Sequence, residues 1–252
     1  MCIRDREYIK QETDYVVGLP VTVGGSGDTS IMTGLGIYMG MKACAKEVWG
    51  SDSLRGKTVA VQGFGKVAPH MAHRLMKEDA TLVVTDVFDG ALDRARDMGL
   101  KVVGPDEIYG VDCDIFAPCA LGGVISPETI PHLKCKVVAG GANNQLLSDG
   151  DGETLHRMGI VYGPDYILNC GGIINVESEI YGGYNADRAR DKTERVYEIM
   201  EKVILISQAQ GIPTAKAADY LAEERLKSVR GIRPVYRKDS VSYTHLTLPT
   251  KA

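Results

Sequence analysis

Residues 57–68 read KTVAVQGFGKVA, and this stretch decides the fold. Its first half, KTVAVQ, is an apolar run typical of a buried strand, and helical spacing begins at Val67. Between them, Gly63, Gly65 and Ala68 form the pattern G-x-G-x-x-A. The first glycine allows a tight turn, the second lets a pyrophosphate approach the backbone, and the alanine lets the helix pack closely on the strand. A strand, this turn and a helix in that order predict a dinucleotide-binding unit.

Strands and helices continue to alternate after this unit. Short apolar runs predict strands at Lys57–Gln62, Thr81–Asp86, Lys101–Val103, Cys113–Phe116, Lys136–Ala139 and Ile160–Tyr162. Helical spacing predicts helices at Ser30–Trp49, Val67–Lys77, Ala91–Met98 and Thr193–Gln210, and a last one from Pro213 to about Arg230. We therefore expect an α/β fold with a doubly wound, mostly parallel sheet of Rossmann type, closed by C-terminal helices.

The ends of the two longest helices follow from their flanking residues. Asp28 is the expected N-cap of the helix Ser30–Trp49, and Gly50 is expected to end it. Gly211 ends the helix Thr193–Gln210 in the same way. The face of that helix expected to be buried carries Val196, Ile199, Met200, Val203 and Ile206.

Composition and charge exclude several classes of protein. The chain has 252 residues, with 29 lysines and arginines against 33 aspartates and glutamates, and its net charge is −4. A generic nucleic-acid binder is basic, so this class is excluded. No apolar stretch reaches the roughly 18 residues of a membrane span, and the N-terminus lacks the apolar core of a signal peptide. The expected location is the cytoplasm, and no metal site is expected because the six cysteines form no Cys-x-x-Cys pair.

Two residues near the glycine turn bear on the cofactor. Asp86 ends the second predicted strand, where a carboxylate accepts hydrogen bonds from the ribose hydroxyls of a dinucleotide. It would repel a 2′-phosphate, so NAD is favoured over NADP. Lys66 either adds positive charge near the pyrophosphate or points to solvent, and the sequence leaves both open.

Polar and small residues follow the later strands, at the edge where doubly wound sheets bind ligands. Ala117, Cys119 and Ala120 suit a wall against the cofactor, and a nucleophilic role for Cys119 is not favoured because no histidine base accompanies it. The amides of Asn143–Gln145 either bridge cofactor and substrate or only form a turn. The pair Gly171-Gly172 lets a ligand come close to the backbone. Ile173 and Val176 share one helical face, which lies either against a binding pocket or against the core.

Together these segments resemble the glutamate/leucine/phenylalanine/valine dehydrogenase family. The matching stretches are ETDYVVG, GGSGDTS, TVAVQGFGKVA, VVTD, CDIFAPCALGG, GGANNQL, GIVYGPDYILNCGGIINV and GIPTAKAAD. The resemblance implies a nicotinamide contact for Thr33, a pyrophosphate cradle at Gly63, Phe64, Gly65, Lys66 and Val67, and a ribose acceptor at Asp86. It also implies an amide at the junction of substrate and cofactor for Asn144, and contacts to the substrate side chain for Ile173 and Val176.

The family resemblance further implies a reaction, which is the reversible NAD-dependent oxidative deamination of an amino acid to its 2-oxo acid and ammonia. An apolar pair at Ile173 and Val176 suits a branched-chain substrate, leucine above all, better than glutamate. Valine or phenylalanine as the preferred substrate stays open, as does a stand-alone NAD-binding module without catalysis. The full-length protein is expected to be a homo-oligomer.

One departure from the family pattern shapes these expectations. Members of the family begin with a substrate domain that holds two lysines and an aspartate for binding and proton transfer, and nothing like it precedes Glu12. Residues 1–11 and 231–252 do not fit the pattern either. We therefore expect residues 12–230 to be the NAD-binding domain of such an enzyme, with no catalytic residue in this chain.

Overall fold

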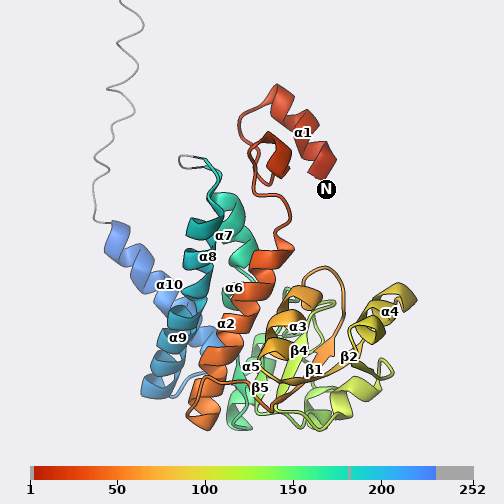
Figure 1. Ribbon diagram of the computed structural model, residues 1–252. Coiled ribbons are helices and arrows are strands. Elements are labelled where there is room, and N and C mark those ends of the chain that lie inside the picture. Colours follow the sequence, from red (N-terminus) through yellow and green to blue (C-terminus); the bar gives the residue numbers. More distant parts are fainter. Residues whose placement is uncertain (1–2, 181–182, 231–252) are drawn as a thin grey trace, which may run out of the picture. The chain divides into compact units, whose positions relative to one another are not determined.

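The computed structural model describes residues 3–180 and 183–230 (Figure 1). The chain forms two units, residues 1–218 and residues 219–252, and the sheet lies in the first. Six parallel strands are arranged in the order β3-β2-β1-β4-β5-β6. They are β1 Thr58–Gln62, β2 Thr81–Thr85, β3 Lys101–Val102, β4 Ile115–Pro118, β5 Val137–Val138 and β6 Val161–Tyr162.

The strand order reverses direction between β1 and β4, and this reversal places a ligand-binding crevice at the carboxyl ends of these strands. Gln62 at the end of β1 pairs with Thr85 of β2 and with Pro118 of β4, so three strands end level with one another. The turns that follow β1, β2 and β4 therefore lie side by side at one edge of the sheet.

Helices connect and cover the strands (Figure 1). They are α1 Ile3–Glu12, α2 Ser30–Trp49, α3 Ala68–Lys77, α4 Asp89–Asp97, α5 Asp149–Arg157, α6 Asp165–Leu168, α7 Gly171–Glu177, α8 Ala186–Glu194, α9 Val196–Gln210 and α10 Thr214–Arg230, with 3₁₀ turns η1 Val21–Val23, η2 Glu107–Gly110 and η3 Ile130–His132. Helix α2 packs against α3, α7 and α9 as well as against the sheet. Within the described residues, no helix is long and apolar enough to cross a membrane.

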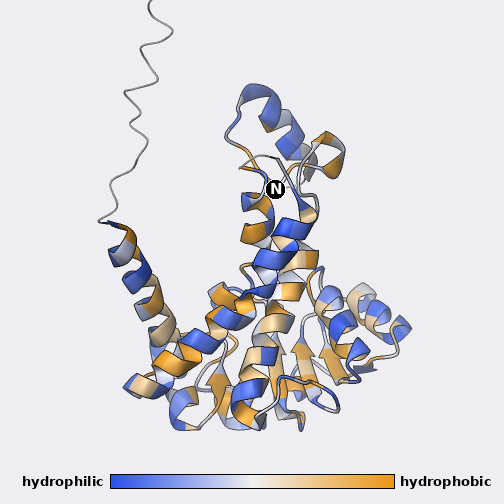
Figure 2. Ribbon diagram, turned by 60° about the vertical axis from the view of Figure 1, so that its left-hand side comes forward, coloured by the Kyte–Doolittle hydropathy of each residue, from blue (hydrophilic) through white to orange (hydrophobic). Residues whose placement is uncertain are grey.

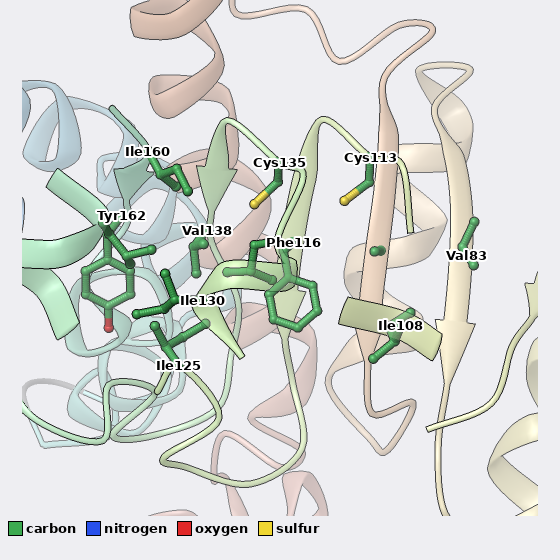
Figure 3. Close-up of a cluster of buried hydrophobic side chains, with 13 residues drawn as sticks. Val83, Ile108, Cys113, Phe116, Ile125, Ile130, Cys135, Val138, Ile160 and Tyr162 are labelled. Carbon is green, nitrogen blue, oxygen red and sulfur yellow. The ribbon is translucent and has the colours of Figure 1, made fainter. Parts of the chain in front are cut away.

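Alternate residues of the strands fill two separate layers of the core, because successive side chains point to opposite faces of a sheet. Figure 3 shows the layer in which Val83, Phe116 and Val138 meet side chains of the connecting segments, among them Ile108 and Ile130. The other face is covered by α2 and α3. The strands accordingly consist mostly of hydrophobic residues, and Figure 2 shows them largely in orange. Such strands are typical of a parallel sheet that is buried on both faces.

The expected fold class is confirmed, and the strand positions agree with the sequence except at β4. The strand was expected at Cys113–Phe116, whereas it runs from Ile115 to Pro118. Asp114, directly before the strand, accepts a hydrogen bond from the Thr58 N–H on its carboxylate at 2.8 Å and donates its own N–H to the Thr58 carbonyl at 2.9 Å. The strand begins two residues later than expected and extends two residues farther toward the site.

Two expectations about helices were wrong. Thr29, not Asp28, is the N-cap of α2, although the Asp28 carboxylate accepts a hydrogen bond from the Ser30 N–H at 2.9 Å. The stretch 193–210 is not one helix, because α8 ends at Glu194 and α9 begins at Val196.

The buried face of α9 also differs from the expected one. It carries Val196, Met200, Val203, Ile204 and Ser207. Successive residues of an α-helix are rotated by about 100°, so these five positions fall on one side of α9. Ile199 and Ile206 lie at the border of that side. Ile199 is accordingly 37% exposed. Gly50 and Gly211 end their helices in the left-handed conformation, as expected.

Candidate functional site

The turn after β1 is built around Gly63, whose φ is +95°. Its N–H donates to the carbonyl of Thr85 at 2.8 Å, which ties the turn to the end of β2. A Cβ at this position would lie 2.7 Å from the backbone nitrogen of Ala120. Both the backbone angle and the close approach therefore require glycine here for reasons internal to the protein.

Gly65 differs because nothing in the protein requires it to be glycine. An added Cβ would meet no atom within 4 Å, and its φ is not positive. The backbone N–H groups of Gly65, Lys66 and Val67 have no protein acceptor within the described part of the chain. They lie directly before α3, where unpaired amides and the helix dipole attract anions. The open space and the free donors together fit a diphosphate.

Phe64, between the two glycines, is engaged within the protein. Its ring is fully buried. Its N–H donates to Asp86 Oδ2 at 2.6 Å, and its carbonyl accepts from Arg94 Nη2 at 3.0 Å. Phe64 therefore anchors the turn and offers a ligand neither its side chain nor its amide. No pattern in the sequence points to Arg94, which reaches the turn from α4.

Asp86 follows β2 and lies half-buried beside the turn. Its Oδ2 accepts from Phe64 and its Oδ1 accepts from the Phe88 N–H at 3.0 Å. Each carboxylate oxygen has two acceptor sites, so both can take a further hydrogen bond from a hydroxyl group. The side chain is thus fixed in place and still able to bind a diol.

A pocket of about 610 Å³ extends along this edge of the sheet. Its lining comprises Gln62, Gly63, Gly65, Thr85, Asp86, Val87, Phe88, Pro105, Cys119, Ala120, Leu121 and Val124. Its larger apolar members Val87, Phe88 and Leu121, which are between 74% and 78% exposed, were not expected from the sequence. The signal was available, since apolar residues directly after strand ends are exposed at the ligand-binding edge.

The residues after β4 divide between wall and core. Cys119 and Ala120 line the pocket, whereas Ala117 lies within β4 and is fully buried. The expectation that Ala117 faces the cofactor is not met, because the strand runs on to Pro118. Burial raises the pKa of the Cys119 thiol to about 11. The thiol is therefore neutral at physiological pH and is a poor nucleophile.

The loop after β5 presents Asn144 in an unusual conformation, with φ of +52°. Its side chain is exposed, and so is that of Asn143. The buried amide of this loop is Gln145, whose Nε2 donates to the carbonyl of Ala142 at 3.0 Å. Of the three amides of Asn143–Gln145, only that of Gln145 is therefore buried, and those of Asn143 and Asn144 are exposed at this edge.

The pair Gly171-Gly172 serves helix packing rather than ligand access. A Cβ on Gly171 would lie 2.0 Å from the carbonyl oxygen of Met32, and one on Gly172 would lie 2.8 Å from Thr33 Oγ1. The glycines thus let α7 approach α2 closely. Thr33 is half-buried in this contact, and its hydroxyl donates to the carbonyl of Thr29 at 2.9 Å.

Helix α7 carries the two apolar residues expected near a substrate. Ile173 is 71% exposed and Val176 is half-buried, and their spacing places them on one face. Ile173 is therefore not a core residue. Beyond the helix end, Glu179 accepts from the backbone N–H groups of Gly18 at 2.9 Å and Ser26 at 2.6 Å. No pattern in the sequence indicates this contact, because it joins residues more than 150 positions apart.

Other side chains with reactive potential are dispersed. Across residues 3–180 and 183–230, no group of three or more histidine, cysteine, aspartate or glutamate side chains is arranged to hold a metal ion. Lys66 is exposed. The five described cysteines are free thiols, and Cys44, Cys113 and Cys135 are buried. The candidate site therefore consists of the residues at the carboxyl edge of the sheet.

Comparison with known proteins gives this geometry a context. The leucine dehydrogenase of Geobacillus stearothermophilus is 53% identical over 232 residues, which are 92% of this chain and 63% of that protein. The phenylalanine dehydrogenase of Caldalkalibacillus thermarum is 39% identical, over 91% of this chain and 64% of that protein. The crystal structure of L-tryptophan dehydrogenase from Nostoc punctiforme superposes with a TM-score of 0.81 at 40% identity, covering 90% of this chain and 65% of that one.

The chain thus spans slightly less than two thirds of the relatives it matches. The sequence pattern of the Glutamate/Leucine/Phenylalanine/Valine dehydrogenase family matches residues 24–101 and 87–230. These ranges contain the glycine turn, Asp86, Asn144 and α7, and they cover most of the chain. The chain belongs to the Glutamate/Leucine/Phenylalanine/Valine dehydrogenase family.

Proposed function

We propose that this chain binds NAD and is the cofactor-binding part of an amino-acid dehydrogenase that deaminates a branched-chain L-amino acid, leucine above all, to its 2-oxo acid. The observation that carries the proposal is the open space over Gly65, bordered by the free N–H groups of Gly65, Lys66 and Val67. These groups would hold the pyrophosphate. The bound nicotinamide would supply the hydride acceptor.

The proposed preference for NAD over NADP rests on Asp86. Its two oxygens are held by the amides of Phe64 and Phe88 and would accept from the two ribose hydroxyls. A 2′-phosphate in the same place would meet a fixed negative charge. Val87 and Phe88 would border the adenosine end of the pocket, and Cys119 and Ala120 would form the opposite wall.

The proposed substrate rests on α7 and on the relatives. Ile173 and Val176 would contact an apolar side chain, and a buried carboxylate of glutamate would find no polar partner in either of them. Thr33 and Asn144 would meet the nicotinamide end. The relative at 53% identity is named a leucine dehydrogenase, and one at 39% a phenylalanine dehydrogenase, so phenylalanine stays as the second candidate substrate.

The proposal assigns this chain cofactor binding and one side of the substrate site, and no proton-transfer group. Deamination needs a base near the amino group as well as the hydride acceptor. The whole enzyme would act as a cytoplasmic homo-oligomer on an amino acid, its 2-oxo acid and ammonia. A stand-alone NAD-binding module is the alternative, and it would bind NADH without ever supporting turnover.

A fusion experiment separates the two. The substrate domain of the Geobacillus stearothermophilus leucine dehydrogenase would be joined ahead of Glu12, and NADH formation would be followed with leucine, valine, phenylalanine and glutamate. We expect NADH binding by the bare chain without turnover, and turnover by the fusion with leucine preferred. A bare chain that deaminates leucine, or a fusion that prefers glutamate, would contradict the proposal. A fusion that binds NADH but stays inactive would favour the stand-alone module.

A further inference from the structure

Asn144 is held by its backbone while its side chain stays free. Its N–H donates to Asp165 Oδ2 at 2.8 Å, and its carbonyl accepts from the Gly123 N–H at 2.7 Å. Its amide side chain has no hydrogen-bond partner among the described residues. A non-glycine residue in the left-handed region costs free energy, and such residues persist where the surroundings fix them. Asn144 therefore combines a strained backbone with a side-chain amide that is exposed and makes no hydrogen bond to the described residues.

The carboxylate of Asp165 holds the Asn144 backbone in the left-handed conformation. It is the first residue of α6, directly after β6, and is only 9% exposed. While Oδ2 binds the Asn144 amide, Oδ1 accepts from the hydroxyl of the buried Tyr162 at 3.0 Å. Burial and the neighbouring carboxylate raise the pKa of Tyr162. The phenol therefore remains a donor at physiological pH and leaves Asp165 one fixed orientation.

The loop after β4 fixes Asn144 from the other side. A Cβ on Gly122 would lie 2.8 Å from the carbonyl oxygen of Asn144 and 2.6 Å from that of Asn143. Only glycine therefore allows the two loops to approach so closely. The segments that follow β4, β5 and β6 thus converge on a single residue at the carboxyl edge of the sheet.

We propose that Asp165 is a positioning residue, which holds the Asn144 backbone in the left-handed conformation and thereby aims the Asn144 amide at the bound cofactor and substrate. The inference rests on the proposed function, because it needs a ligand at this edge. Asp165 itself is buried beneath the loop and bonds to Asn144 and Tyr162, so it acts through Asn144 rather than by touching the ligand.

The conformational half of the proposal can be tested without a cofactor. In isotope-labelled protein, the Cα and Cβ chemical shifts of Asn144 report its backbone angles, and amide hydrogen exchange reports its hydrogen bond. Asp165→Ala should move the shifts out of the left-handed range and speed exchange about tenfold or more. Asp151→Ala is the matched control, since Asp151 is 3% exposed and caps α5 through Ser148. It should leave Asn144 unchanged.

The binding half uses a double-mutant cycle with NADH fluorescence on folded variants. Asn144→Gly keeps the backbone angle without strain and removes the amide. Asp165→Ala and Asn144→Gly should each weaken NADH binding about tenfold, and the double variant should be no weaker than either, because both remove the same contact. Asp165→Asn, which keeps an acceptor for the Asn144 amide, should restore most of the affinity.

Each remaining outcome has a distinct meaning. If Asp165→Ala leaves the Asn144 shifts and exchange unchanged, the proposal is overturned. If its effect on NADH binding adds fully to that of Asn144→Gly, Asp165 acts by another route and the proposal is also overturned. If the unmodified chain binds no NADH, the proposed function fails, and with it the ligand-directed half of this inference, while the shifts still decide what holds Asn144.

Discussion

The carboxylate of Glu179 accepts a hydrogen bond from the backbone N–H of Ser26 at 2.6 Å, across 153 positions of the sequence. The same carboxylate binds the N–H of Gly18 at 2.9 Å, and Asn175 binds the Ser26 carbonyl at 3.3 Å. The loop of residues 18–26, which leads into α2, is therefore held by hydrogen bonds to residues in α7 and just beyond its end. These contacts fix the start of α2 relative to the helix that carries Ile173.

Loss of the Glu179 hydrogen bonds should make the loop of residues 18–26 more mobile and destabilise the protein. Glu179→Ala leaves the backbone N–H groups of Gly18, Leu19 and Ser26 without their acceptor, and we expect a loss of about 1.5–3 kcal/mol in the free energy of unfolding. Urea denaturation and limited proteolysis within residues 18–26 measure it. Glu177→Ala, at the last residue of α7, is the control, because its ion pair with Lys192 is half-exposed and contributes little. Equal losses for the two variants would contradict the assigned role of Glu179.

The two glycines of the turn should respond differently to substitution. Gly65→Val should abolish NADH binding and leave stability nearly unchanged, because its side chain would enter space that the protein leaves open. Gly63→Val should destabilise the protein itself, since it combines a positive φ with a clash against Ala120. Gly110→Val, another glycine with open space around it, should affect neither. Calorimetry with NADH and thermal unfolding measure both effects, and unchanged NADH binding in Gly65→Val would place the pyrophosphate elsewhere.

Asp86 should determine the choice between the two nicotinamide cofactors. Asp86→Ala removes the ribose acceptor and the negative charge together, so NADH affinity should fall about tenfold and NADPH affinity should rise. Fluorescence titration with both reduced cofactors gives the two dissociation constants. The preference for NADH over NADPH is the deciding quantity, and a ratio that stays the same in the variant would rule out this role.

Glu78 should make stability depend on pH in the acid range. Burial opposes its ionisation, but hydrogen bonds from Lys42, Tyr38 and the Leu54 N–H outweigh that effect and lower the pKa of Glu78 below its ordinary value of 4.5. A lowered pKa contributes stability that is complete above the ordinary value and is lost as pH falls through the value in the folded protein.

The measurement compares the free energy of unfolding of the unmodified chain and Glu78→Gln between about pH 7 and pH 3. We expect the unmodified chain to be more stable by about 1–3 kcal/mol at the upper end, and the difference to shrink toward the lower end. A difference that is independent of pH would show that the charge of Glu78 contributes nothing.

The close contact of α7 with α2 should depend on Gly171. Gly171→Ala places a methyl group 2.0 Å from the Met32 carbonyl, so the helices must separate, at a cost of about 1–3 kcal/mol or more. Gly90→Ala in α4, where a Cβ meets nothing, should instead stabilise by about 0.5–1 kcal/mol. Thermal unfolding of the two variants tests the contrast, and equal effects would show that the glycine pair does not serve packing.

Structure and function could be predicted best where they depend on residues that are adjacent in the sequence. The run from Lys57 to Ala68 specifies a strand, a turn and a helix by local chemistry, and the later apolar runs extend this pattern to the whole sheet. The break at Arg195 was missed because α8 and α9 share one continuous polar and apolar pattern. Apolar Val87 and Phe88 after β2 could have been recognised as pocket residues from their position alone.

Other features depend on partners that a single sequence does not reveal. Asp165 and Glu179 are ordinary acidic residues until the fold brings them to the backbones of Asn144 and Ser26. The role of Gly171 is set by α2, which precedes it by more than a hundred positions. The turn chemistry of glycine and asparagine was visible in the sequence, but the packing that requires them was not.

The position of α2 has a consequence for how the chain is made. Its buried flank, which includes Leu35, Ile37 and Met41, is covered partly by α9. A ribosome that adds ~5–20 residues per second needs roughly 7 to 30 s to proceed from Trp49 to Val196. For much of that interval, once α2 has emerged from the tunnel, α9 does not yet exist. A chaperone that captures short apolar helices on nascent chains would therefore find an uncovered apolar flank on α2.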